Sequence, residues 1–305
     1  MTTPWNSDAL WMKAKLFINL AMDDEDQRSF EERALWASLA LELLGKAALS
    51  RVSPLLIATP SEDGENLLAA AGLIAGTPRF KSIPAHTLFS RCAAAFRPFS
   101  AREAAKIAEN RNEYLHSATA SFAPIPESAW WPRYWSQART LIEACDEDLD
   151  SFVGSTRVAA VERFLEQNER NITERVEMLI ERARRDLARF VAGDMLVRES
   201  ESWAHPRDLS VNLRYNALAT CPACGSSSGC LEGDEIMETA VSYDRMSEED
   251  VYVTLHHDVG ADYFSCSTCR LVLDGYELLE AAELPTSIAA EDEAAGAWEP
   301  DYGND

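Results

Sequence analysis

Four of the seven cysteines form two Cys-x-x-Cys pairs in the last third of the chain. Cys221 and Cys224 make the first pair, and 41 residues separate it from Cys266 and Cys269. Each Cys-x-x-Cys turn points two thiolates at one centre, and two such turns supply the tetrahedral set that Zn²⁺ accepts. The pattern predicts a structural zinc site, because four protein ligands leave no coordination position for a substrate water.

Two other interpretations concern the same region. A Cys-x-x-Cys pair can act as a redox dithiol, although one pair rather than two would suffice for that role. Cys230, His256 and His257 could serve as ligands, but two complete pairs leave no vacancy for them. Strand-like runs over 235–243, 251–257 and 262–279 predict a zinc ribbon with a long central hairpin.

A second constellation is the hexapeptide Arg-Asn-Glu-Tyr-Leu-His that runs from Arg111 to His116. Ser100 and Glu103 form a capping-box pattern, which predicts that the helix carrying this motif starts there and ends near residue 117. An imidazole takes and gives protons near neutral pH, and a guanidinium holds a phosphate through paired hydrogen bonds. Asn112 lies one turn before His116 and could orient the imidazole or the phosphate. These residues suit metal-free cleavage of RNA through its 2′-OH.

The motif resembles that of the HEPN family, helical-bundle proteins whose ribonuclease members carry an Arg, a short spacer and a His. The resemblance includes an upstream apolar helix, where Glu42 and Lys46 match an acidic residue followed by Lys, and it covers roughly residues 7–153. It implies a metal-independent endoribonuclease, as in toxins or antiviral defence, with Arg111 and His116 as catalytic residues. Asn112 would assist them, and Glu42 and Lys46 would lie at the rim of the site.

The resemblance also implies a homodimer. Within one straight helix Arg111 and His116 point about 140° apart and lie about 7.5 Å apart along the axis, so one copy does not aim both at one atom. A two-fold dimer would bring both copies of the motif into one cleft.

A simpler interpretation of the same residues is structural. Arg111 could pair with Glu109 or Glu113 on a solvated face, and the helix dipole favours His116 near a helix C-terminus. Glu42 and Lys46 could form an ordinary salt bridge between positions i and i+4. The chain would then be a non-catalytic, dimeric interaction protein whose zinc ribbon docks a protein partner or inhibitor.

The charge distribution separates the two halves of the chain. The net charge is −23, but residues 221–305 hold about 20 of the 51 acids and only two of the 28 bases. An RNA partner requires Lys and Arg, so the ribbon is not expected to bind RNA through its own surface. The stretch 79–116 carries only three Glu against seven bases: Arg79, Lys81, Arg91, Arg97, Arg102, Lys106 and Arg111.

The remaining pattern predicts a mainly α protein with a small C-terminal β ribbon. Apolar periodicity predicts helices over 7–21, 29–51 and 136–153, a short helix within 59–83, and a long amphipathic helix over 155–192 that packs in its own domain or dimerises. An aromatic cluster at 130–135 closes a core or stacks bases. We expect a HEPN-like helical domain over 1–153, a long helix and linker over 154–200, a zinc ribbon over 210–282 and an acidic disordered tail over 283–305.

Location is also expected from the sequence. No apolar run reaches the roughly 18 residues that span a bilayer, and the N-terminal residues lack the pattern of an export signal. Paired cysteines of this kind are typical of metal sites in a reducing compartment. The sequence therefore predicts a cytoplasmic protein with no membrane partner.

Overall fold

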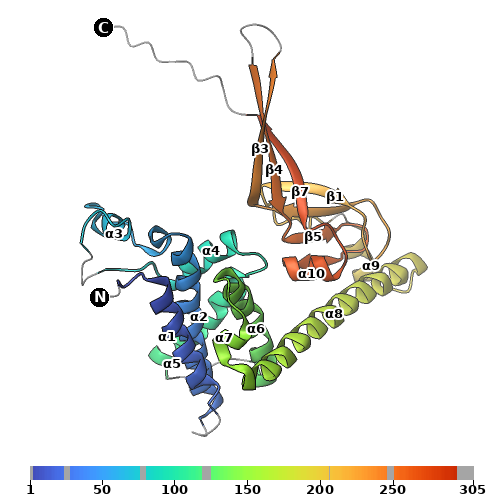
Figure 1. Ribbon diagram of the computed structural model, residues 1–305. Coiled ribbons are helices and arrows are strands. Elements are labelled where there is room, and N and C mark those ends of the chain that lie inside the picture. Colours follow the sequence, from blue (N-terminus) through green and yellow to red (C-terminus); the bar gives the residue numbers. More distant parts are fainter. Residues whose placement is uncertain are drawn as a thin grey trace. The chain divides into compact units, whose positions relative to one another are not determined.

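The computed structural model describes residues 3–23, 28–75, 80–118, 125–205, 207–245 and 251–293. The chain divides into two compact units, Met1–Glu169 and Arg170–Asp305 (Figure 1). The first unit is helical, and the second combines the end of a long helix with two small β-sheets. The expectation of a mainly helical protein with a small C-terminal β region is confirmed.

The first unit is built around one apolar helix. This helix, α2 (Phe30–Val52), packs along α1 and contacts α4, α5 and α6. Its interior positions are small or aliphatic and are buried on most sides, as the sequence predicted. The other elements of this unit are α1 (Ser7–Ala21), the 3₁₀ helix η1 (Pro54–Ile57), α3 (Glu65–Ala70), α4 (Ala85–Ala95), α5 (Ala101–His116), α6 (Glu127–Ala144) and α7 (Leu149–Val153).

Local signals explain where these helices start and stop. The side chain of Ser29 accepts a hydrogen bond from the Glu32 amide and caps α2, and Ser53 followed by Pro54 ends it. Ser100 caps α5 in the same way by accepting from the Glu103 amide. The predicted bounds of α1, α2 and α5 are therefore confirmed to within one or two residues.

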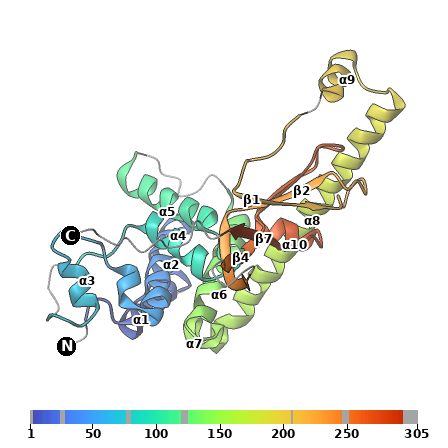
Figure 2. The ribbon, with the colours of Figure 1, turned by 90° about the horizontal axis from the view of Figure 1, so that it is seen from above.

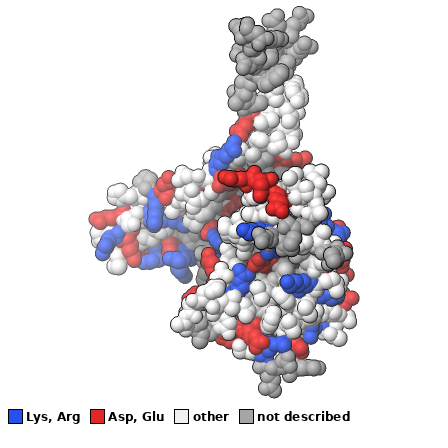
Figure 3. All heavy atoms as spheres, turned by 90° about the vertical axis from the view of Figure 1, so that its left-hand side faces the viewer, with Lys and Arg blue, Asp and Glu red and all other residues white. Residues whose placement is uncertain are grey.

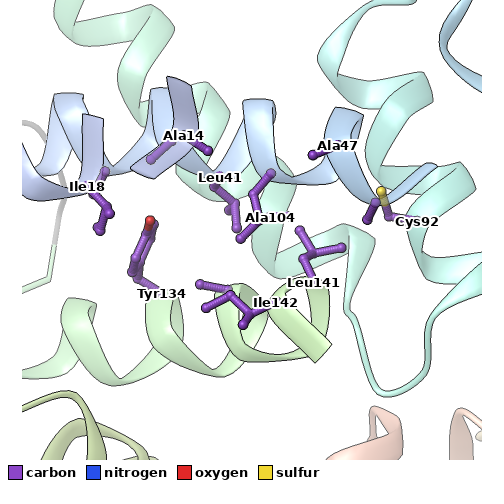
Figure 4. Packing of buried hydrophobic residues seen from close by; sticks show 14 of the residues in the cluster. Ala14, Ile18, Leu41, Ala47, Cys92, Ala104, Tyr134, Leu141 and Ile142 are labelled. Atoms are coloured by element: carbon purple, nitrogen blue, oxygen red, sulfur yellow. The ribbon is translucent and has the colours of Figure 1, made fainter. Parts of the chain in front are cut away.

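The aromatic cluster belongs to the core. Trp135 and Tyr134 have no exposed surface, and Trp130 and Trp131 are 2% and 3% exposed. Figure 4 shows Tyr134 and its neighbours on α6 pointing toward residues of α1, α2 and α5. Because bases could not reach these rings, the core interpretation is confirmed and the base-stacking alternative is wrong.

Three helical segments differ from the sequence prediction. Helix α6 begins at Glu127 and ends at Ala144, whereas a helix over 136–153 was expected. Pro132 lies inside α6, and burial of the four aromatic side chains outweighs the hydrogen bond that the proline removes. Asp146 has a left-handed φ of 55°, which separates α6 from α7. Helices α4 and α9 (Val197–Ala204) were not predicted from the sequence.

The long helix α8 (Ser155–Ala192) has the predicted bounds and is continuous in both ribbon views (Figures 1 and 2). In its first half Val161 and Leu165 join the core of the helical unit. In its second half Val176 and Ala183 join the core of the C-terminal unit. The apolar stripe is thus used within the chain, once in each unit.

The C-terminal unit contains two antiparallel sheets. One has the strand order β1-β2-β5-β6, from strands Tyr215–Ala219, Gly229–Gly233, Tyr263–Cys266 and Val272–Asp274. The other has the order β3-β4-β7, from strands Glu235–Arg245, Val251–Gly260 and Ser287–Glu293. The hairpin of β3 and β4 is the long hairpin that the sequence predicted. A short helix, α10 (Tyr276–Ala281), lies between β6 and β7.

The segment 283–305 was expected to be a disordered acidic tail, and this is wrong for its first part. Residues 287–293 form β7, which pairs antiparallel with β4 from Ser287↔Gly260 to Glu293↔Thr254. Ile288 is 1% exposed, so one apolar side chain anchors the strand. Asp292 also accepts hydrogen bonds from Arg214 and Tyr215. Residues 294–305 lie outside the described residues. Among the described residues, no helix is both long and apolar enough to cross a membrane.

Candidate active site and metal centre

Helix α5 carries the RNxxxH motif and decides which of its side chains are buried. Ala104, Ile107, Ala108 and Arg111 share the buried face, because positions i, i+3, i+4 and i+7 lie on one side of a helix. Arg111 is accordingly 8% exposed. His116 is the last residue of α5, on a different face, and is exposed.

Arg111 is held in an ionic cluster with α2. Its Nη1 donates to Glu42 Oε2 at 2.6 Å, and Lys46 Nζ donates to the other carboxylate oxygen, Oε1, at 2.8 Å. The side chains of Arg111, Glu42 and Lys46 are 10%, 20% and 14% exposed. Two cations surround one carboxylate, so this cluster carries a net positive charge in a mostly buried place. Such a charge favours an anion nearby.

The titration of Glu42 follows from these contacts. Burial raises the pKa of Glu42, but the charges of Lys46 and Arg111 and the hydrogen bonds that they donate lower it by more. The pKa therefore lies below the ordinary value for Glu, and the carboxylate stays ionised at neutral pH. The predicted Glu42–Lys46 salt bridge is confirmed, and Arg111 is its third member.

The side chain of Asn112 forms hydrogen bonds with Arg111, not with His116. Its Oδ1 accepts hydrogen bonds from Arg111 Nε at 3.2 Å and from Arg111 Nη2 at 3.1 Å. The hydrogen bonds and the ion pair of Arg111 go to Asn112 and Glu42 and not to Glu109 or Glu113. Three of the five guanidinium N–H groups are thus engaged by Glu42 and Asn112, which leaves two for another acceptor.

One chain does not bring the two expected catalytic side chains together. The hydrogen bonds and ion pairs of Arg111 go to Glu42 and Asn112, while His116 lies exposed more than one turn further along α5. The sequence predicted this divergence from helical geometry. Any chemistry that uses both groups therefore needs a second chain or a substrate that bridges them.

The surface around the helical unit has mixed charge. Figure 3 shows basic and acidic side chains interspersed over the face that is drawn, without a continuous basic field. Two of the bases of the stretch 79–116 form ion pairs with acids, Lys106 with Glu103 and Arg111 with Glu42. Arg79 lies outside the described residues. Attraction of RNA would therefore depend on local cation sites, such as the Arg111 cluster.

In the C-terminal unit the four cysteines converge on one point. The Sγ atoms of Cys221, Cys224, Cys266 and Cys269 all lie within 4.8 Å of one another. Cys221 and Cys269 are 3.5 Å apart, and Cys224 and Cys266 are 3.8 Å apart. A zinc ion with bonds of about 2.3 Å to four sulfurs requires S···S separations of about 3.8 Å. These separations fit a four-thiolate metal site, and they are too long for disulfide bonds.

Both Cys-x-x-Cys turns are closed by the same backbone device. The amide of Gly225 donates to the Cys221 carbonyl, and the amide of Arg270 donates to the Cys266 carbonyl. The two donors have left-handed φ values of 71° and 61°. A glycine adopts this conformation at no cost, whereas Arg270 bears some strain, so its turn must be stabilised by other contacts.

The thiol pKa values indicate how the site binds a cation. Burial raises the pKa of Cys221 to about 11 and also raises that of Cys269. Burial acts in the same direction on Cys266, but the Cys269 amide, the Ser228 hydroxyl and the Thr268 amide offset it and lower the pKa to about 7. A metal would displace protons from the other thiols, so its affinity must fall as the pH falls.

Two arginines that the sequence did not single out support the metal turns. Arg184 of α8 donates to the carbonyls of Ala223 and Pro222 at 2.9 and 3.0 Å. Arg270 donates to the carbonyl of Ser202 at 2.6 Å, and its guanidinium lies 4.4 Å from the ring centroid of Trp203. Each turn is thus attached to a neighbouring helix by one guanidinium. Sequence spacing carries no signal for contacts of this kind.

The three other residues considered as metal ligands, His256, His257 and Cys230, have different contacts. His256 contacts Ser242 and Glu291, and His257 contacts Thr239 and Asp292, all on the second sheet. Cys230 is half-buried and its Sγ lies near the Leu231 carbonyl.

Comparisons with known protein families, with curated proteins and with solved structures found no match to this chain. The resemblance to the HEPN family therefore rests on the residues quoted for it.

Proposed function

We propose that this chain is a metal-independent endoribonuclease of HEPN type that acts as a homodimer. The observation that carries the proposal is that α5 bears both an exposed histidine, His116, and a buried cationic cluster around Arg111. Within this cluster Arg111 has two guanidinium N–H groups left for an acceptor, and Lys46 is the second cation. These groups supply the base and the phosphate site that cleavage through the 2′-OH requires.

The proposed reaction is an internal phosphoryl transfer. A neutral His116 takes the proton of a ribose 2′-OH, and the oxygen attacks the adjacent phosphorus. The bond from phosphorus to the 5′-oxygen breaks, and an imidazolium supplies the proton that the 5′-oxygen needs. The products are a 2′,3′-cyclic phosphate and a 5′-OH end. DNA lacks the attacking hydroxyl and is not a substrate.

The second copy of the chain completes this site. One imidazole cannot be base and acid in the same step, and Arg111 points away from His116 within one helix. A two-fold axis near the end of α5 would place the two copies of His116 on opposite sides of the scissile phosphate. One copy would act as base and the other as acid.

The roles of the remaining polar residues follow from their contacts. Arg111 and Lys46 would attract the phosphate and stabilise the charge that develops on it. Glu42 and Asn112 are positioning residues, since they fix three of the guanidinium N–H groups. Their effect on cleavage should therefore pass through Arg111.

We further propose that the four cysteines hold a structural zinc ion. Four thiolates suit zinc better than magnesium or calcium, which prefer oxygen ligands. When bound, the ion would fix both turns of the ribbon, and with all four positions occupied by sulfur it would not activate water. Cleavage should consequently need no added metal.

The test is cleavage of a labelled RNA by the purified full chain in the presence and absence of EDTA. His116→Ala should lower the cleavage rate by about 10²- to 10⁴-fold and leave the melting temperature unchanged. The control is His86→Ala, because His86 is also an exposed helical histidine, at the start of α4, but lies outside the site. A DNA of the same sequence should stay intact.

Equal rates for His116→Ala and the wild type would end the nuclease proposal. The burial of Arg111 and its pairing with Glu42 would then be purely structural, and the chain would be a non-catalytic interaction protein. Because EDTA can also remove the structural metal, far-UV circular dichroism must show that the chelated protein is still folded.

A further inference from the structure

Strand β3 lies at the edge of its sheet. It has 11 residues and pairs along its length with β4 alone, from Glu235↔Gly260 to Arg245↔Val251. The strand order is β3-β4-β7, so no strand within the described residues pairs with its outer side (Figure 1). An edge of this length presents a row of backbone donors and acceptors to which another chain can add.

One face of the hairpin beside this edge is apolar and exposed. The register places Val241 opposite Leu255 and Tyr243 opposite Val253, so these four side chains share a face. Val241 is 46% and Tyr243 70% exposed, and Leu255 and Val253 are half-buried. An exposed apolar face beside an open strand edge is a candidate contact surface for a further strand.

The opposite face is already satisfied by polar contacts. Ser242 Oγ lies 2.8 Å from His256 Nε2, and Glu291 Oε1 lies 3.1 Å from His256 Nδ1. These contacts link β3, β4 and β7 across the sheet. At the other edge of this sheet, β7 pairs with β4 although β7 does not belong to the hairpin.

Beyond the register irregularity between Ile236 and Glu238, β3 has little protection against strand addition. The strand contains neither proline nor lysine, the residues that commonly block an exposed edge. The charge of this region favours a basic partner: Glu235, Glu238 and Asp244 on the strand outnumber Arg245, and residues 221–305 carry about −18. Two copies of the C-terminal unit would repel each other through their net negative charge, whereas a basic segment would be attracted.

We propose that the outer edge of β3 binds an extended, basic peptide segment as an additional strand. Its backbone would pair with β3, alternate apolar side chains would cover Val241 and Tyr243, and its cations would face the acidic surface. This surface is independent of the RNxxxH helix, and the proposal stands or falls separately from the ribonuclease proposal.

The experiment uses the full chain and a fluorescent synthetic peptide that alternates lysine and valine and is about as long as β3. One control peptide alternates glutamate and valine, and another keeps lysine and valine but has alternate backbone amides methylated. Fluorescence anisotropy should show that the first peptide binds at least about tenfold more tightly than either control. Added salt should weaken binding.

Variants then locate the site. Val241→Lys and Tyr243→Lys should each weaken binding at least about tenfold, because they add like charge and remove the apolar contact. The matched control is Leu218→Lys, since Leu218 is 81% exposed on β1 of the other sheet. His116→Ala should bind the peptide as the wild type does.

Three results would overturn the proposal. Equal binding of the methylated peptide would show that charge attraction alone is responsible. An equal loss with Leu218→Lys would place the peptide elsewhere. Sedimentation showing that Val241→Lys dissociates a dimer would assign the edge to a second copy of this chain.

Discussion

The four cysteines of the C-terminal unit converge on one point, whereas the two expected catalytic side chains of the helical unit diverge. The cysteines stand on two turns, each closed by a left-handed residue, and turns can face one another. Arg111 and His116 stand on one helix, which rotates each successive side chain by about 100°. The four thiols are complete within one chain, while groups that diverge along one helix, such as Arg111 and His116, need a second chain or a bridging substrate to act together.

The largest effect is expected when one of the four clustered cysteines is replaced. Cys221→Ser should abolish stoichiometric zinc binding and unfold the ribbon, because a structural zinc site contributes about 10–16 kcal/mol of apparent binding free energy. Atomic absorption and limited proteolysis measure the two effects. Cys230→Ser, outside the cluster, should retain both metal and fold. Full metal content in Cys221→Ser would contradict the four-thiolate site.

Glu42 tests how strongly the ionic cluster stabilises the helical unit. Glu42→Ala leaves two mostly buried cations without their carboxylate, and we expect a loss of about 3 kcal/mol in the free energy of unfolding. Denaturant titration measures this loss. Glu143→Ala removes the exposed partner of Arg139 and should change the stability by less than about 0.5 kcal/mol. Similar values for both variants would show that the cluster is only a surface ion pair.

The pH dependence of the same cluster has a definite sign. Lys46 and Arg111 lower the pKa of Glu42 in the folded chain, so its contribution to stability is complete above the unfolded pKa of about 4.3. That contribution is lost as the pH falls through the lower, folded pKa. The difference in unfolding free energy between wild type and Glu42→Gln should therefore shrink below about pH 4. A difference that is constant with pH would refute this account of Glu42.

The smallest effect concerns β7, which joins the ribbon through Asp292. This carboxylate accepts from Arg214 Nη2 and Tyr215 Oη, each at 2.9 Å, and it is 36% exposed. Asp292→Ala should lower the melting temperature of the C-terminal unit by about 2–4 °C and increase hydrogen exchange in β7. Glu280→Ala, on α10, serves as the control. Unchanged exchange in β7 would show that Ile288 alone anchors the strand.

Sequence patterns predicted the elements that depend on neighbouring residues. The cap at Ser100, the stop at Ser53-Pro54 and the periodicity of α8 are local signals, and the structure follows them. The start of α6 was missed because Pro132 signals a break locally, while burial of its aromatic neighbours is a property of the whole unit. Strand β7 was missed because its acidic composition resembles a disordered segment.

The candidate sites show the same limit. Cysteine spacing identified the four clustered thiols, because each Cys-x-x-Cys pair forms a local turn and two such pairs are typical of a metal site. Spacing also paired Glu42 with Lys46 on one helix. It could not show that Arg111 joins them or that Asn112 serves Arg111, because those contacts depend on how α5 packs against α2.

Mixing wild type with His116→Ala tests most directly whether two copies of the chain form one catalytic cleft. If each cleavage needs a histidine from both chains, only dimers of two wild-type chains are active. An equal mixture that has exchanged subunits should then retain about one quarter of the wild-type rate. A rate of about one half would contradict the shared cleft, and an absence of cleavage by the wild type itself would contradict the nuclease.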